Sequence, residues 1–249
     1  MEPVRTHRAK TVVEAARLHR VKERKARGLT LVEGPELIRD IAATGANIVD
    51  VFSTSGTEGA VPESAPLPIL VDERALERLA GTKSPRGPVA VVEIPAEGLD
   101  RSRSLLVSVG VSDPGNAGAL VRTAAAFGWG FAYMSGSADP WSPKSIRAGA
   151  GGQFQTPVAA IDAIDEVADW ATVATVPRGG KDPSTVKERP VAVLIGEEAH
   201  GLDEAILSAA THLVTIPTPG ATESLNAAVA AGIAVYTLSR GSGESGAGV

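Results

Sequence analysis

Residues 105–124, LLVSVGVSDPGNAGALVRTA, hold the pattern that decides the fold. The run Leu105–Val111 is almost wholly apolar, as in a strand that is covered on both faces of a parallel sheet. A turn at 112–116 follows, and apolar residues then recur at the 3.6-residue spacing of a helix, at Ala117, Leu120, Val121 and Ala124. Strand, turn and helix in this order form the unit from which parallel α/β sheets are built.

The same unit repeats toward the C-terminus. Further strands are predicted at Gly130–Met134, Ala171–Val176, Val191–Ile195 and His212–Ile216, and helices at 116–127, 143–149, 162–170, 203–210 and 223–239. The last helix is predicted to bury Leu225, Ala228, Val229, Gly232, Ile233 and Tyr236. We therefore predict an α/β domain with a mostly parallel sheet over residues 104–240, followed by a disordered tail at 241–249.

A smaller αβ unit that includes the basic N-terminal segment is predicted over residues 1–97. Thr11–Glu14 has the form of a capping box that opens a helix, and Gly28 is its expected end. Strands follow at 29–32, 48–53, 69–71 and 89–94, and helices at 34–44 and 73–80. The polar, Pro- and Gly-containing stretch 95–104 marks the domain boundary.

Composition excludes several classes of protein. The chain of 249 residues is 43% hydrophobic and has no cysteine, which excludes disulfides, thiolate metal sites and a cysteine nucleophile. No apolar run approaches the roughly 20 residues that cross a bilayer, so we expect a cytoplasmic protein without a membrane segment. No His, Asp or Glu cluster has metal-ligand spacing, so we expect no metal.

Charge is distributed unevenly. The net charge is −5, yet the first 30 residues carry nine basic and three acidic side chains, which leaves −11 on the rest. A basic arm of this kind can bind a polyanion, although a solvated, charged helix would have the same composition. The predicted RNA-binding residues of the arm are Arg20, Lys22, Arg24, Lys25 and Arg27.

The loops that follow the strands of the second domain are the candidate site, because ligands of open parallel sheets bind beyond the carboxyl ends of strands. These loops contain glycine but neither GxGxxG nor a phosphate-binding Gly-Lys-Ser/Thr. Ordinary glycine-rich turns would explain each loop alone. The polar residues at their ends favour a site: Asn116, Arg122, Glu198, Ser224 and Asn226.

Three segments resemble the motifs of the SpoU (TrmH-type) RNA methyltransferases of the SPOUT superfamily. Residues 113–124 resemble the first motif, 194–202 the second, and 216–217 with 223–226 the third. Residues 142–151 resemble a segment between the first two. Residues 10–96 resemble the ribosomal-protein-L30e-like substrate-binding domain of many members.

The resemblance implies an α/β-knot domain with a C-terminal trefoil knot, a homodimer, and S-adenosylmethionine as the cofactor. The reaction implied is methyl transfer to a ribose 2′-hydroxyl of structured RNA, most simply 23S rRNA, with tRNA as an alternative. By position, the cofactor would contact Val176, Gly196, Ile216, Leu225 and Asn226.

The motif residues can be given roles. The resemblance implies a base-like role for Arg122, but a guanidinium rarely loses its proton, so we expect Arg122 to bind phosphate and stabilise the developing alkoxide. Asn116 would hold the loop or the ribose, and Glu198 would accept hydrogen bonds. Ser224 and Asn226 would bind RNA or cofactor, or cap the last helix. Lys144 and Arg147 would contact RNA phosphate.

One departure supports a competing hypothesis. The second motif usually reads Gly-Asn-Glu-Gly, whereas Glu197 and Ala199 replace its Asn and second Gly here. A catalytically weak or inactive RNA-binding or ribosome-assembly protein with the same fold would fit this change. A nucleotide-binding enzyme with an unknotted fold is a third alternative, against which the missing nucleotide motifs argue.

Overall fold

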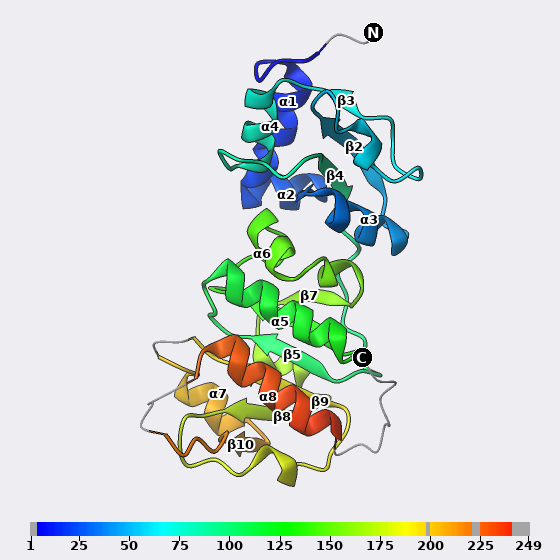
Figure 1. The fold of residues 1–249 in the computed structure, drawn as a ribbon. Coiled ribbons are helices and arrows are strands. Elements are labelled where there is room, and N and C mark those ends of the chain that lie inside the picture. The colour runs from blue at the N-terminus through cyan, green and yellow to red at the C-terminus, as the bar shows by residue number, and fades with distance from the viewer. Residues whose placement is uncertain (1–3, 198–199, 221–224, 241–249) are drawn as a thin grey trace. The chain divides into compact units, whose positions relative to one another are not determined.

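The computed structural model describes residues 4–197, 200–220 and 225–240, which form two compact units (Figure 1). The first unit is built from the chain up to Ala96 together with Asp139–Gln155, and the second from Glu97–Ala138 and the chain from Thr156 onward. The sequence did not indicate that 139–155 pack with the N-terminal residues. The functional division at 97 and 104 stays a prediction, and the tail 241–249 lies outside the described residues.

The first unit is a four-stranded sheet with helices on both faces. The strands run in the order β1-β4-β2-β3, with β4 antiparallel to β1 and β2 and with β3 parallel to β2. Their bounds are Leu29–Glu33 (β1), Ile48–Ser53 (β2), Ile69–Leu70 (β3) and Val89–Glu93 (β4). The helices are α1 (Lys10–Ala16), α2 (Val21–Arg27), α3 (Pro35–Ala43), α4 (Glu73–Ala80) and α6 (Pro143–Ala148), with short 3₁₀ turns at Arg17–His19, Glu58–Ala60 and Gly152–Phe154.

Alternating strand residues build a separate core on each face of this sheet. Leu31, Phe52 and Val91 pack with residues of α1 and α4. Val32, Val51 and Val92 lie on the opposite face and pack with α3 and with Ile146 of α6. The segment 139–155 therefore completes one of the two cores of the first unit.

The basic N-terminal segment is part of this core and not a free arm. Val12, Ala15 and Leu18 are buried against the sheet. The predicted capping box is wrong, because α1 begins at Lys10 and its N-cap, Ala9, makes no side-chain cap. The single helix predicted from Thr11 is also wrong, since the extended Arg20 separates the 3₁₀ turn from α2. The predicted end is confirmed by Gly28 in the left-handed conformation, φ 62°.

The second unit contains a six-stranded, wholly parallel sheet in the order β10-β8-β9-β5-β6-β7. The predicted α/β class with a mostly parallel sheet is confirmed. The strands are β5 (Leu105–Ser108), β6 (Gly130–Met134), β7 (Val158–Ile161), β8 (Ala171–Thr175), β9 (Val191–Ile195) and β10 (His212–Val214). The helices are α5 (Pro114–Ala126), α7 (Glu204–Ala209) and α8 (Ala227–Arg240), with 3₁₀ turns η4 (Ile164–Val167) and η5 (Pro183–Thr185).

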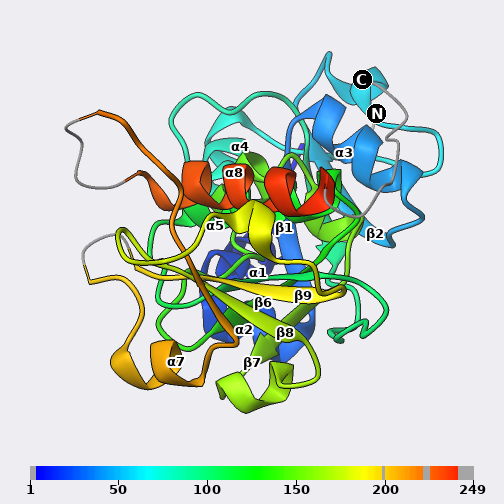
Figure 2. The same ribbon diagram turned by 90° about the horizontal axis from the view of Figure 1, so that it is seen from below.

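Helices α5 and α8 lie side by side on one face of this sheet (Figures 1 and 2). The other face packs with η4 through Val167 and with α7 through Ile206 and Leu207. The strand β7 was missed by the sequence analysis, and the helix predicted at 162–170 is only the 3₁₀ turn η4. None of the helices in the described part of the chain has the length and apolar character that a bilayer crossing requires.

The buried face of α8 differs from the prediction. The helix buries Ala227, Ala231, Ala234, Val235 and Leu238. Val229, Ile233 and Tyr236, which were predicted to be inside, are exposed by 51%, 39% and 50%. An alanine-rich helix offers apolar residues on all sides, so the sequence alone does not identify which face packs.

Candidate active site

A pocket of about 500 Å³ lies beyond the carboxyl ends of β8, β9 and β10. It contains four of the predicted cofactor-binding residues, Val176, Gly196, Ile216 and Leu225, which come from four separate stretches of the chain. Its other lining residues are Thr175, Pro177, Ile195, Glu197, His200, Gly201, Leu202, Leu207, Val214, Thr218, Ala227 and Ala230. The volume is within the range of about 300–1,000 Å³ that is usual for small-molecule sites.

Backbone forms much of the pocket wall. The Val176 amide donates to the Val214 carbonyl at 2.9 Å, which holds the loop after β8 against β10. A Cβ atom on Gly196 would lie 2.4 Å from the carbonyl carbon of Gly201, so only glycine fits there. In the same loop as Val176, hydrogen bonds from Ser184 lower the pKa of Asp182 and keep this carboxyl ionised.

The pocket fits a nucleoside-type cofactor. Its walls combine apolar side chains, such as Leu202 and Leu225, with the glycine-containing backbone around Gly196. Apolar walls can enclose an aromatic base, while backbone amides and carbonyls offer hydrogen bonds to its polar edge. Four of the five predicted cofactor residues therefore lie where such a group would be held.

Two predicted catalytic residues meet beside the pocket. Asn226 lies between the pocket residues Leu225 and Ala227, and its Nδ2 donates to Oδ1 of Asn116 at 3.1 Å. Oδ1 of Asn226 also accepts from the amides of Ala228 and Val229, at 3.0 and 3.2 Å. Asn226 thus caps α8 and contacts the first turn of α5 at the same time.

Asp113, which the sequence analysis did not select, places Asn116. Its Oδ1 accepts from the amides of Gly115 and Asn116 at 2.7 and 3.0 Å and so caps α5. The Asp-Pro pair before a periodic apolar helix is the sequence signal that could have identified this cap.

Arg122 lies on α5, six residues after Asn116, and is exposed. Within the described part of the chain, its guanidinium makes no hydrogen bond or ion pair. The remaining predicted catalytic residues, Glu198 and Ser224, lie outside the described residues.

Glu197 has a defined partner at the rim of the pocket. Its Oε2 is 3.1 Å from Nδ1 of His200, and both residues line the pocket. The carboxylate that replaces the usual Asn of the motif is thus in contact with a neighbouring imidazole.

The predicted RNA-binding residues divide into two groups. Arg20, Lys22, Lys25, Arg27 and Lys144 are exposed. Arg24 is only 3% exposed and is a correction to the prediction. Its Nε and Nη2 contact Oδ2 of Asp139 at 3.0 and 2.5 Å, and its Nη1 donates to the carbonyls of Leu18 and His19. This guanidinium is fully used inside the first unit and is not available to a phosphate.

Arg147 is exposed, but its Nη1 is 2.5 Å from Oε2 of Glu33 in the first unit.

Among the residues that the structure describes, no group of three or more His, Asp and Glu side chains could hold a metal ion.

Comparison with known proteins identifies the class to which this fold and site belong. The chain belongs to the SpoU rRNA Methylase family, whose model matches residues 103–236. A second model, the MRM3-like substrate binding domain, matches residues 9–90. The resemblance drawn from the sequence motifs is confirmed.

Individual relatives match nearly the whole chain. The 23S rRNA (guanosine(2553)-2′-O)-methyltransferase RlmP of Bacillus subtilis is 29% identical over 96% of this chain and 99% of its own length. The solved structure of the SpoU methyltransferase AviRb of Streptomyces viridochromogenes in complex with AdoMet covers 95% of this chain and 99% of its own, with a TM-score of 0.84 and 27% identity. An AdoMet-bound rRNA methyltransferase of Sinorhizobium meliloti covers 95% and 98%, with a TM-score of 0.80 and 26% identity.

Proposed function

We propose that this protein transfers a methyl group from S-adenosylmethionine to a ribose 2′-hydroxyl of 23S rRNA. The observation that supports this most is the pocket beyond β8, β9 and β10, which contains four of the predicted cofactor residues beside the Asn116–Asn226 contact. The similarity to rRNA 2′-O-methyltransferases over nearly the whole chain supports the RNA class.

The chain contributes positioning and charge to this reaction. When bound, the cofactor supplies an electrophilic methyl group on a sulfonium. A 2′-hydroxyl is a weak nucleophile at neutral pH, so alignment with that methyl group gives much of the rate. Arg122, exposed and without a partner among the described residues, would bind the adjacent phosphate and stabilise the charge that develops on the ribose oxygen. Asn116, held by Asp113 and Asn226, would orient the ribose.

Exposed basic residues of the first unit would recruit the RNA. Arg20, Lys22, Lys25 and Arg27 are exposed on and next to α2, and Arg27 is additionally held by the carbonyl of Glu14 at 2.9 Å. Such contacts to phosphate give affinity that falls with salt. Residues 1–97 and 104–240 would thus divide RNA recruitment and methyl transfer between them.

A homodimer would cover the exposed apolar face of α8. Tyr236 packs edge-on against Phe127, with ring centroids 6.4 Å apart, and Phe127 is itself 40% exposed. Val229 and Ile233 lie at helical spacing before Tyr236 and are exposed as well. Exposed apolar side chains on one helix face often mark a contact with another protein. We propose that a second copy of the chain packs against this face of α8.

The C-terminal segment would follow the knotted path of this family. Strand β9 lies between the earlier strands β8 and β5, and α8 packs against both β9 and η5, which supports passage of the last segment through the loop 176–190 as a trefoil knot. We place the activity in the cytoplasm, with the ribosomal RNA.

Mapping of 2′-O-methyl groups in 23S rRNA tests the proposed function. Primer extension at limiting nucleotide concentration should show a stop in rRNA from cells that contain the protein and no stop at that site when its gene is deleted. Purified protein with S-adenosylmethionine should restore the stop in unmodified RNA. Cofactor binding in calorimetry without any new methyl group on 23S rRNA would contradict the assigned substrate.

A further inference from the structure

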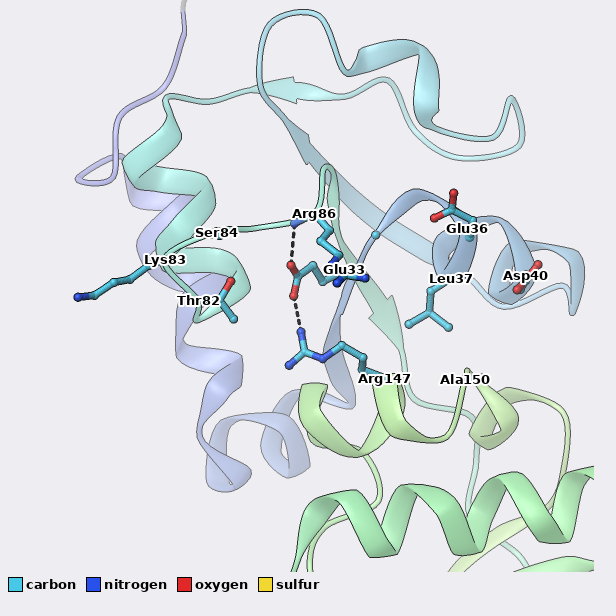
Figure 3. Close-up of a pocket in the computed structure, with 11 residues that line it drawn as sticks. Glu33, Glu36, Leu37, Asp40, Thr82, Lys83, Ser84, Arg86, Arg147 and Ala150 are labelled. Carbon is cyan, nitrogen blue, oxygen red and sulfur yellow. Dashed lines mark hydrogen bonds and ion pairs between the residues drawn. The ribbon is translucent and has the colours of Figure 1, made fainter.

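A second pocket, of about 790 Å³, lies within the first unit (Figure 3). It is formed by the end of β1, the start of α3, the loop after α4, and residues that follow α6 or end it. Its lining residues are Glu33, Gly34, Glu36, Leu37, Asp40, Thr82, Lys83, Ser84, Arg86, Arg147 and Ala150. All belong to the first unit, so this pocket is separate from the one that the proposed cofactor would occupy.

The carboxylate of Glu33 fixes the shape of the pocket. Its side chain is only 10% exposed, its Oε1 accepts from the Arg86 amide at 2.9 Å, and its Oε2 contacts Nη1 of Arg147 at 2.5 Å. Figure 3 shows these two contacts as dashed lines that meet at the Glu33 carboxylate. The loop after α4 and helix α6 are thereby both held to the end of β1 before any ligand arrives.

Cationic groups on one side of the pocket have no partner in the described part of the chain. The side chains of Lys83 and Arg86 are exposed and make no hydrogen bond or ion pair there. Oγ1 of Thr82, in the same loop, is buried without a hydrogen-bond partner among the described residues. Donors without partners beside a preformed cavity are the groups that an anionic oxygen would use.

The opposite side of the pocket is acidic, and the pocket also has apolar lining residues. Glu36 and Asp40 are one turn apart on α3, across from the Thr82–Arg86 loop (Figure 3). Leu37 and Ala150 supply the apolar part. Ala150 has φ 48°, and it is the single non-glycine residue with positive φ among the described residues. Such a conformation is retained where the surrounding structure enforces it, often at binding sites.

We propose that this pocket binds one unpaired RNA nucleotide whose base carries an exocyclic amino group. The inference rests on the proposed function, because it assumes an RNA substrate. The 5′-phosphate would contact Arg86 and Lys83, and the base would lie on Leu37 and Ala150. The amino group would donate to a carboxylate of α3, at Glu36 or Asp40. Cytosine, adenine and guanine have such an amino group, whereas uracil lacks it.

Small nucleotides test the ligand chemistry directly, with the whole protein. CMP and UMP have the same size and phosphate and differ in the amino group. In NMR titrations of labelled protein, CMP should shift the amide signals of residues 82–87 and bind about fivefold more tightly than UMP, the difference expected from one net hydrogen bond. Glu36→Gln/Asp40→Asn should abolish this preference. Equal binding of the two nucleotides by the wild-type protein, or binding of neither, would overturn the proposal.

RNA binding tests whether the site serves the RNA and not a free nucleotide. Lys83→Ala/Arg86→Ala should lower affinity for transcribed 23S rRNA by about fivefold per lost phosphate contact at 0.1 M salt, and should reduce the salt slope by about 0.7 per contact. The matched control is Arg39→Ala/Arg74→Ala, which removes the same charge from exposed positions of the same unit outside the pocket. An equal loss in both variants, or no loss in the first, would overturn the proposal.

Two further measurements separate this proposal from the proposed function. Calorimetry with S-adenosylmethionine should give the same affinity for wild-type protein and for Lys83→Ala/Arg86→Ala. If the wild-type protein methylates 23S rRNA while the variant retains full RNA affinity, the pocket proposal alone fails. If the wild-type protein neither binds nor methylates 23S rRNA, the proposed function is wrong, and the pocket proposal, which rests on it, is wrong with it.

Discussion

At the scale of single residues, Arg122 is the most direct test of the proposed chemistry. Arg122→Ala removes a guanidinium that has no partner among the described residues, so the fold should not change. Loss of a group that stabilises developing charge lowers the rate by about 10²–10³-fold, and we expect this loss in single-turnover methylation. Cofactor affinity in calorimetry should be unchanged.

Arg101→Ala is the matched control, because Arg101 is an exposed arginine of the same unit that pairs with Asp169 at 2.6 Å. It should methylate at the wild-type rate. Full activity of Arg122→Ala would remove the role that we assign to Arg122.

Asn226 combines two functions that substitution can separate. Asn226→Asp keeps the acceptor for the amides of Ala228 and Val229 but loses the amide that donates to Asn116. Its stability should remain within about 0.5 kcal/mol of wild type, whereas Asn226→Ala should lose about 1 kcal/mol with the cap. Methylation should fall in both variants. If Asn226→Asp is fully active in the methylation assay, the Asn116 contact has no catalytic consequence.

At the scale of elements, the glycine between β9 and α7 sets the shape of the cofactor pocket. Gly196→Ala would place Cβ against the backbone of Gly201 and Leu202, at 2.4–2.7 Å. The loop must shift, at a cost of about 1–3 kcal/mol, and calorimetry should show correspondingly weaker binding of S-adenosylmethionine. Gly98→Ala has open space for its methyl group and should bind normally. Unchanged affinity in Gly196→Ala would mean that the cofactor does not use this loop.

The exposed face of α8 gives a prediction for assembly. Ile233→Glu would bury an unpaired carboxylate in the proposed dimer, a change that weakens association by about 3 kcal/mol or more. Sedimentation velocity should show monomer for Ile233→Glu and dimer for the wild type. Arg101→Glu, an exposed charge change away from α8, is the control. A wild-type monomer at all concentrations would contradict the dimer.

Some elements were predictable and others were not, for physical reasons. Strands such as Val191–Ile195 are continuous apolar runs, and the helix 73–80 begins at the Asp72 cap and ends at Gly81, so local sequence defines them. Val176, Gly196 and Ile216, which line one pocket, were predicted from the resemblance of segments at strand ends to the family motifs. The strand Val158–Ile161 has only four residues after a proline, and its pairing with β6 is a tertiary effect. Which face of α8 is buried depends on the elements that pack against it, and the spacing of apolar residues within the helix does not predict them.

At the scale of the whole molecule, the ion pair of Arg24 and Asp139 joins sequence positions 115 residues apart. The local sequence does not predict that Arg24 is buried while the neighbouring basic residues are exposed. Arg24→Ala would leave Asp139 without its partner in a largely buried place, which we expect to lower the free energy of unfolding by about 3–5 kcal/mol. Denaturant titration of the intact chain would show this as an earlier transition of the first unit.

The neighbouring Lys25 is exposed, and Lys25→Ala should leave that transition unchanged. In the double variant Arg24→Ala/Asp139→Ala, the loss should be smaller than the sum of the two single losses, because neither charge remains buried alone. Strict additivity would mean that the pair contributes nothing as a pair.

The segment 139–155 bears on how such proteins exchange parts during evolution. One hydrophobic face of the N-terminal sheet is completed by Ile146, and Phe154 packs there as well, from a stretch of chain that lies between two strands of the methyltransferase sheet. Recombination that transplants only the first 97 residues into a relative would separate this face from its cover. A viable chimera must therefore inherit the matching segment at the same time, so the N-terminal residues 24 and 33 are expected to co-evolve with their partners at positions 139 and 147.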